Sequence, residues 1–125
     1  MSDFDAGLEI RRAVLGDEYV DHALARQDDF TAPFQDFITR FAWGDVWGRP
    51  GLDRRTRSCI TVALLAALGQ AGELAVHLRG ALRNGVTVDE LREVLLHTAV
   101  YAGIPAANTA FTVAQDVLGD EGALP

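Results

Sequence analysis

Helix-ending residues divide the chain of 125 residues into consecutive helical segments, and this division restricts its fold more than any other feature. Asn84-Gly85 is a helix-ending pair, and Thr87 and Glu90 after it have the spacing of a capping box. No segment shows the alternation of polar and apolar residues that is typical of a β-strand. The sequence therefore predicts an all-α, compact bundle of about six helices in a single domain, residues 1–125.

Apolar periodicity predicts how two of these helices pack. Phe34, Phe37, Ile38 and Phe41 are spaced i, i+3, i+4 and i+7, so we expect this helical face to pack inward. A later helix is apolar on nearly every side over residues 59–68, which predicts burial all round and suggests contacts between subunits. The expected helices cover residues 8–25 with a bend at residue 16, the segment around residues 34–41, and residues 53–68, 71–83 and 87–102. A last helix has Pro105 in its first turn and extends to about residue 118.

The charge of the chain restricts its partners. Eighteen acidic residues against eleven basic ones give a net charge of −7, which opposes binding to nucleic acid and to anionic membranes. All eleven basic residues are Arg, so Schiff-base chemistry on a lysine is excluded. The longest uncharged stretch, residues 58–72, is too short to span a bilayer. With a single Cys and no secretory signal, we expect a cytoplasmic protein.

A cluster of arginines stands out in this acidic chain. Arg49, Arg54, Arg55 and Arg57 fall within nine residues and could bind a small anion by bidentate pairing with a carboxylate. The alternative is a solvated helix start whose charges pair with nearby acids.

Two histidines are candidates for acid–base chemistry. Glu73 and His77 are four apart on one expected helix, so the carboxylate can orient the imidazole and raise its basicity. His97 and Tyr101 are also four apart, in an otherwise apolar run. Each histidine could instead be a core or interface residue that bonds one partner. Glu73, His77 and His97 have the composition of a two-His, one-carboxylate metal site, but their spacing is not diagnostic and we expect no metal.

The chain resembles the carboxymuconolactone decarboxylase family of the protocatechuate branch of the β-ketoadipate pathway. The resemblance covers most of the chain and includes Glu73 and His77. Its segments are RAVLGD (12–17), ITRFAWG (38–44) with Trp47, RPGLDRRTRS (49–58), AALG (66–69), NGVT (84–87), EVLLHTAVYAG (93–103) and PAAN (105–108). Related disulfide reductases of the alkylhydroperoxidase-like superfamily carry a CxxC pair, and those two positions here look like Gln70 and Glu73, with Ser58 in place of the assisting carboxylate.

The resemblance implies an alkylhydroperoxidase-like fold, a homo-oligomer (a hexamer or trimer of dimers), and neither metal nor organic cofactor. It implies decarboxylation of γ-carboxymuconolactone, a small anionic lactone, to β-ketoadipate enol-lactone and CO₂ in aromatic catabolism. On this basis the candidate catalytic residues are Glu73, His77 and His97, and the candidate substrate-binding residues are Arg49, Arg54, Arg57, Trp43, Trp47 and Tyr101. The alternatives are a peroxidase-like or other lactone or keto-acid enzyme of the superfamily, and a non-catalytic helical oligomeric binding module.

Overall fold

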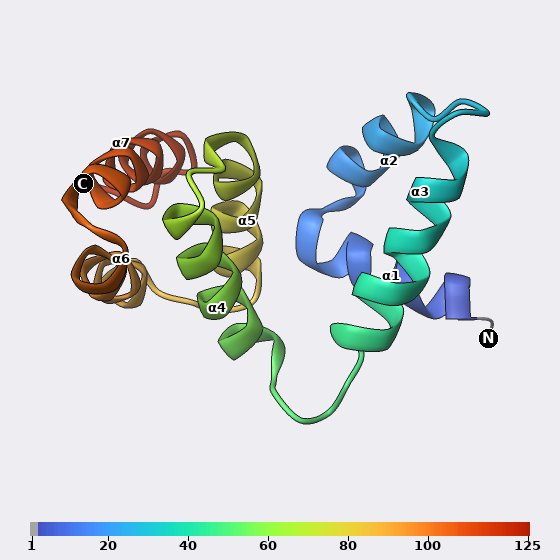
Figure 1. The fold of residues 1–125 in the computed structure, drawn as a ribbon, viewed down its shortest axis with the longest axis horizontal. Helices are drawn as coiled ribbons and strands as arrows, with labels where there is room; N and C mark the ends of the chain where they lie inside the picture. The colour runs from blue at the N-terminus through green and yellow to red at the C-terminus, as the bar shows by residue number, and fades with distance from the viewer. Residues whose placement is uncertain (1–2) are drawn as a thin grey trace. The chain divides into compact units, whose positions relative to one another are not determined.

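The computed structural model describes residues 3–125, in which all regular structure is helical. The chain divides into two compact units, one up to Asp53 and the other from Arg54 to Pro125 (Figure 1). The predicted all-α class is confirmed. The described residues form seven α-helices and one π-helix rather than about six helices, partly because Gly16, at φ +89°, separates the first expected helix into two.

The first unit is held together by a close approach of two helix backbones. It comprises α1 (Asp3–Leu15), α2 (Asp17–Ala25), α3 (Ala32–Phe37) and the π-helix η1 (Ile38–Val46). A Cβ atom at Gly7 of α1 would overlap the carbonyl oxygen of Thr39, and a Cβ at Gly44 of η1 would lie 3.7 Å from the Cα of Gly7. The two glycines therefore allow α1 to lie directly against η1.

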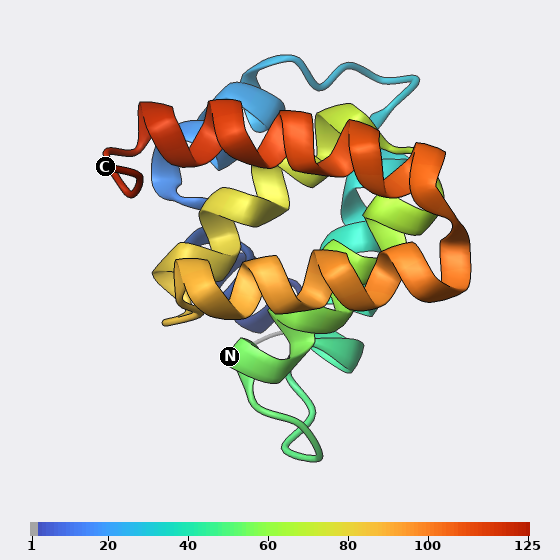
Figure 2. The same cartoon turned by 90° about the vertical axis from the view of Figure 1, so that its left-hand side faces the viewer.

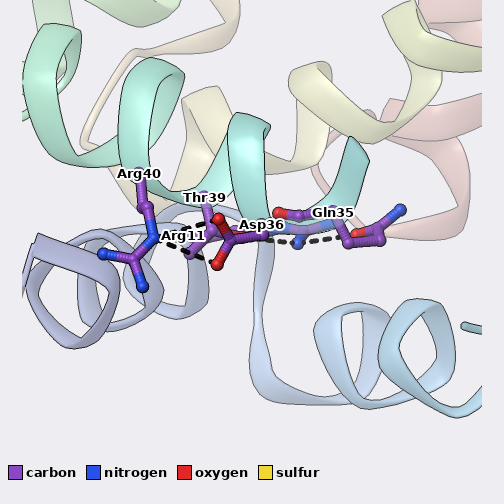
Figure 3. Close-up of polar contacts among 5 residues, drawn as sticks. All are labelled: Arg11, Gln35, Asp36, Thr39 and Arg40. Atoms are coloured by element: carbon purple, nitrogen blue, oxygen red, sulfur yellow. Dashed lines mark hydrogen bonds and ion pairs between the residues drawn. The ribbon is translucent and has the colours of Figure 1, made fainter. Parts of the chain in front are cut away.

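A buried arginine links the same two helices. Arg11 of α1 is only 4% exposed, and its Nη1 donates to Gln35 Oε1 at 3.0 Å and to Thr39 Oγ1 at 3.3 Å (Figure 3). On the exposed side of the same helical segment, Arg40 Nε donates to both carboxylate oxygens of Asp36, at 3.0 Å each (Figure 3). The interior of this unit is thus partly polar, which the apolar periodicity did not predict.

The prediction that the Phe34–Phe41 face packs inward is wrong. Phe34, Phe37 and Phe41 are 60%, 57% and 50% exposed. Gln35, Thr39, Trp43 and Trp47, spaced four apart, are buried or half-buried instead, and Ile38 of the predicted face is half-buried. The physical reason is that the side of this segment with Gln35 and Thr39 packs on α1, so the phenylalanines lie away from that contact.

The second unit is a bundle of four helices: α4 (Arg54–Ala67), α5 (Ala71–Arg83), α6 (Val88–Ala102) and α7 (Ile104–Asp120). α5 packs on α4 and α7, and α6 packs on the same two helices, so α5 and α6 lie across the bundle from one another. α6 and α7 run antiparallel beside each other (Figure 2). Its core is aliphatic and includes the fully buried Leu74, Leu78, Leu91 and Leu95.

Most predicted helix ends of this unit are confirmed. Thr87 and Glu90 form both bonds of the capping box, at 3.0 and 3.1 Å. Gly69, Gly85 and Gly103 have positive φ at the ends of α4, α5 and α6.

Cys59 is a free cysteine. None of the helices described here is long and apolar enough to cross a membrane.

The expectation that α4 is buried all round does not hold for the chain by itself. Its buried residues Ser58, Val62 and Ala66 follow one face, four residues apart. Ile60, Leu64 and Leu68 on another side are 43%, 56% and 70% exposed. A four-helix bundle of 72 residues has neighbours for only part of each helix surface, so a helix that is apolar all round keeps an uncovered apolar face.

Candidate active site

Several chemistry-bearing side chains of the second unit lie along α4 and α5, which pack against each other. We call this the α4–α5 seam and define it by Arg54 and Ser58 on α4 and by Glu73, His77 and Asn84 on α5. Asn84 Nδ2 donates to Ser58 Oγ at 2.9 Å and makes a longer contact of 3.5 Å with the carbonyl of Arg54, which joins the two helices. Since residues seven or eleven apart share a side of an α-helix, His77 and Glu73 lie on the same side of α5 as Asn84.

His77 is the seam residue whose protonation is most perturbed. It is half-buried in the middle of α5, and burial lowers its pKa to about 4. The imidazole is therefore neutral at pH 7 in the protein without ligand. The expectation that Glu73 raises the basicity of His77 is wrong for this state, because loss of hydration disfavours the imidazolium and Glu73 is exposed in the first turn of α5.

Ser58 and Asn84 are seam residues that the sequence did not predict as functional. Ser58 is 1% exposed, although it lies on an otherwise apolar buried face. The sequence interpretation treated Asn84 only as a helix-ending residue. One feature of the sequence indicates Ser58. It lies four residues before Val62 and eight before Ala66, on a stripe expected to be buried, and a buried polar side chain needs a hydrogen-bond partner.

The arginine cluster divides into residues with different surroundings. Arg55 donates from Nε to the carbonyl of Gly85 at 3.3 Å and forms an ion pair with Glu90, so it connects α4 to the start of α6. Arg54 is exposed at the first residue of α4, and Arg57 is half-buried one turn further on. Both residues lie in the first turn of α4, and a helix N-terminus carries a partial positive charge of its own. Arg49 belongs to the first unit.

His97 and Tyr101 lie elsewhere in the second unit. Both are exposed on α6, and their ring centroids are 5.2 Å apart. Because α5 and α6 lie across the bundle and His97 faces away from its core, the structure does not bring His97 and His77 together within this unit. Among residues 3–125, no three His, Cys, Asp or Glu side chains group closely enough to hold a metal ion.

Trp43 and Trp47 belong to the first unit. Trp43 is 6% exposed within η1, and Trp47 follows the last residue of that helix. Their rings stack with centroids 5.0 Å apart. Trp43 lies inside a helix, because η1 continues through Gly44 as far as Val46.

Comparison with known proteins identifies the family of the chain. The model of the family described as "Carboxymuconolactone decarboxylase family" matches residues 32–116. The chain belongs to the carboxymuconolactone decarboxylase family. The matched region runs from α3 to α7 and so contains the whole α4–α5 seam of this decarboxylase-family chain, together with His97 and Tyr101.

Two family relatives are similar over nearly the whole chain. The chain is 52% identical over 122 residues to a 4-carboxymuconolactone decarboxylase of Acinetobacter baylyi, covering 98% of this chain and 91% of that protein. It is 49% identical over 117 residues to a nitrosuccinic acid decarboxylase of Metarhizium robertsii, covering 94% of this chain and 82% of that protein. A 42-residue match at 55% identity to a 4-carboxymuconolactone decarboxylase of Pseudomonas putida covers 34% of this chain and 88% of that sequence.

Proposed function

We propose that this chain is a carboxy-lyase that converts γ-carboxymuconolactone to β-ketoadipate enol-lactone and CO₂ in the cytoplasmic catabolism of protocatechuate. The observation that carries the proposal is 52% identity, over 98% of the chain, to a protein named for this activity. The two units work as a single domain, and the family match that runs across their boundary supports this.

The reaction requires a site for negative charge and a proton. When the ring carboxylate leaves as CO₂, the electron pair of the broken C–C bond moves through the ring alkene onto the lactone carbonyl oxygen. The substrate is thus its own electron sink, and the protein has to stabilise the enolate oxygen and protonate a ring carbon.

His77 supplies the proton in this proposal. The imidazole is neutral without ligand because burial lowers its pKa to about 4. A bound substrate with two carboxylates raises that pKa, since nearby negative charge favours the imidazolium. His77 then takes a proton from solvent as the dianion binds and gives it to the ring carbon, which balances the proton that the overall reaction consumes. Glu73, one turn away, assists by keeping the imidazolium oriented.

The remaining candidates bind the substrate. Arg54 and Arg57 at the start of α4 hold the carboxylates by bidentate hydrogen bonds. His97 and Tyr101 complete the site from a neighbouring subunit of a homo-oligomer, and the exposed position of both on α6 supports this arrangement.

Nitrosuccinate is a second candidate substrate. A relative at 49% identity is named as a nitrosuccinic acid decarboxylase. Nitrosuccinic acid and γ-carboxymuconolactone both carry, on one carbon, a carboxyl group, a –CH₂–COOH arm and a group that accepts an electron pair. In the nitro compound the pair released with CO₂ moves onto the oxygens of a nitronate. A site that binds the retained carboxylate and a developing oxyanion suits either compound.

Purified protein should be incubated with freshly generated γ-carboxymuconolactone, and CO₂ release and loss of lactone absorbance followed together, with nitrosuccinate in parallel. We expect turnover of the lactone and a fall of about 100-fold or more in kcat on His77→Ala with circular dichroism unchanged. Neither compound losing CO₂ would contradict the proposal and favour a binding module. Full activity of His77→Ala would remove His77 from the mechanism, and peroxide consumption that Cys59→Ser leaves unaffected would exclude a thiol-dependent peroxidase activity.

A further inference from the structure

The hydroxyl of Ser58 behaves differently from other helical hydroxyls of this chain. Five threonines donate their Oγ1–H to the carbonyl oxygen four residues earlier, at 2.7–3.3 Å: Thr39, Thr61, Thr98, Thr109 and Thr112. Ser58 instead accepts, from Asn84 Nδ2 at 2.9 Å. The carbonyl of Arg54, which would be its usual acceptor, receives the longer 3.5 Å contact from the same Asn84 nitrogen.

The direction of this bond leaves the Ser58 hydroxyl with a hydrogen to donate. A hydroxyl has one donor and two acceptor positions, and Asn84 uses one of the acceptor positions. Within residues 3–125, the structure shows no hydrogen bond that Ser58 Oγ donates. Ser58 is 1% exposed, and a buried donor that is left unused costs free energy. A ligand oxygen that accepts this hydrogen would recover that cost.

The Ser58 hydroxyl lies on the same two helices as the other seam residues. It lies one turn after Arg54 on α4, at the first residue of the buried face. Asn84, its partner, shares a side of α5 with His77 two turns away. An exposed arginine, a buried hydroxyl and a half-buried imidazole therefore lie along α4 and α5, the two helices that the Asn84–Ser58 bond joins.

We propose that Ser58 donates a hydrogen bond to the substrate oxygen on which negative charge develops as CO₂ leaves, and that Asn84 is the positioning residue that keeps this hydrogen available. The inference rests on the proposed decarboxylation. Ser58 keeps its proton throughout: the C–C bond to the carboxylate breaks, the electron pair reaches the acceptor oxygen, and the hydrogen bond to that oxygen strengthens as its charge grows. The ring carbon is protonated by another group.

Two substitutions test the direction of the hydrogen bond. Ser58→Ala removes the donor, and we expect kcat to fall about 100-fold with little change in KM, because the bond gains strength only as charge develops. Asn84→Asp keeps a polar bond between the helices but replaces a donor with a carboxylate that accepts the Ser58 hydrogen. We expect the same fall in kcat, with circular dichroism and oligomeric state preserved. Thr98→Ala, a buried hydroxyl already bonded to the Val94 carbonyl, is the matched control and should keep its kcat.

The outcomes separate this inference from the proposed function. Turnover by the unaltered protein together with undiminished kcat in Ser58→Ala would overturn the role of Ser58 alone. If Ser58→Ala does not fold, Asn84→Asp decides, and a kcat equal to that of the unaltered protein overturns the inference. An equal loss in Thr98→Ala would also overturn it, because the effect would then follow from loss of any buried hydroxyl. Absence of turnover in the unaltered protein overturns both proposals.

Discussion

At the scale of single residues, the protonation of His77 links the proposed site to the stability of the chain. Burial lowers the pKa of its imidazole in the folded state to about 4, from 6.5 in the unfolded state. Between these values the unfolded chain binds a proton that the folded chain does not. The stabilising effect is therefore complete above pH 6.5 and is lost as the pH falls from 6.5 to 4.

This linkage predicts the effect of removing the imidazole. In urea unfolding at a series of pH values, the unaltered chain should lose up to about 3 kcal/mol of its free energy of unfolding between pH 7 and pH 4 through this group. His77→Gln should show a shallower dependence over that interval. Identical pH profiles for the two proteins would show that His77 is not held neutral.

The two arginines at the start of α4 are predicted to differ in function. Arg54 is exposed, whereas Arg55 is tied to Gly85 and Glu90. Arg54→Gln should raise KM for a dianionic substrate roughly tenfold through loss of a charge-assisted hydrogen bond. Arg79→Gln is the control, and it should leave KM unchanged. It removes a partly exposed ion pair between Arg79 and Glu121. Steady-state kinetics at fixed ionic strength measures KM for both variants. Equal KM values in the unaltered protein, Arg54→Gln and Arg79→Gln would contradict the role of Arg54.

At the scale of helices, the contact between α1 and η1 depends on the absence of side chains. A Cβ atom at Gly7 would overlap the Thr39 carbonyl, which belongs to backbone and cannot rotate away. Thr39 and Trp43 are the buried residues of η1. Close packing of backbone at the two glycines therefore helps to specify the helix pair, beside the buried side chains of Thr39 and Trp43.

Gly7→Ala should lower the free energy of unfolding by about 1–3 kcal/mol, since the two helices have to move apart. Gly119→Ala is the matched control: this helical glycine of α7 has nothing within 4 Å of an added Cβ, so alanine should be neutral or stabilise by up to about 1 kcal/mol. Thermal unfolding of the two variants measures the difference. Equal stabilities would show that α1 and η1 tolerate a wider separation.

At the scale of the whole molecule, apolar surface remains uncovered in the single chain. Around the junction of α6 and α7, Leu96, Val100, Tyr101 and Ile104 are 48%, 75%, 81% and 72% exposed. Monomeric proteins rarely expose large contiguous apolar patches, and such patches mark interaction sites. His97 lies among these residues, which is the basis for placing it at a contact between subunits in the proposed oligomer.

Val100→Asp should therefore weaken association, because a charge buried in an apolar contact without a partner is costly. Light scattering coupled to size exclusion should show a smaller mass than for the unaltered protein. Gln115→Glu, which adds the same charge at an exposed position of α7, should keep the native mass. A native mass for Val100→Asp would place the subunit contact elsewhere, and a monomeric mass for the unaltered protein would contradict the proposed homo-oligomer.

The amino-acid sequence determined the helices and most of their ends. Asn84-Gly85, the capping box of Thr87 and Glu90, and Gly103 act through their own backbone conformation and nearest neighbours, so they can be interpreted without a tertiary structure. The family resemblance likewise depends on residue identity at fixed spacing. The Glu73–His77 pair was found in this way, since four residues always place two side chains on one side of a helix.

Tertiary structure alone decided what covers each helix and which way each polar group points. Packing of α1 on the side of Gln35 and Thr39 left the phenylalanine stripe exposed, and the order of packing around the bundle separated His97 from His77. Burial lowered the pKa of His77, although its neighbour along the helix is a carboxylate. The bond from Asn84 to Ser58 joins residues 26 apart. Hydration and hydrogen-bond direction depend on atoms from distant parts of the chain, so local periodicity carries no information about them.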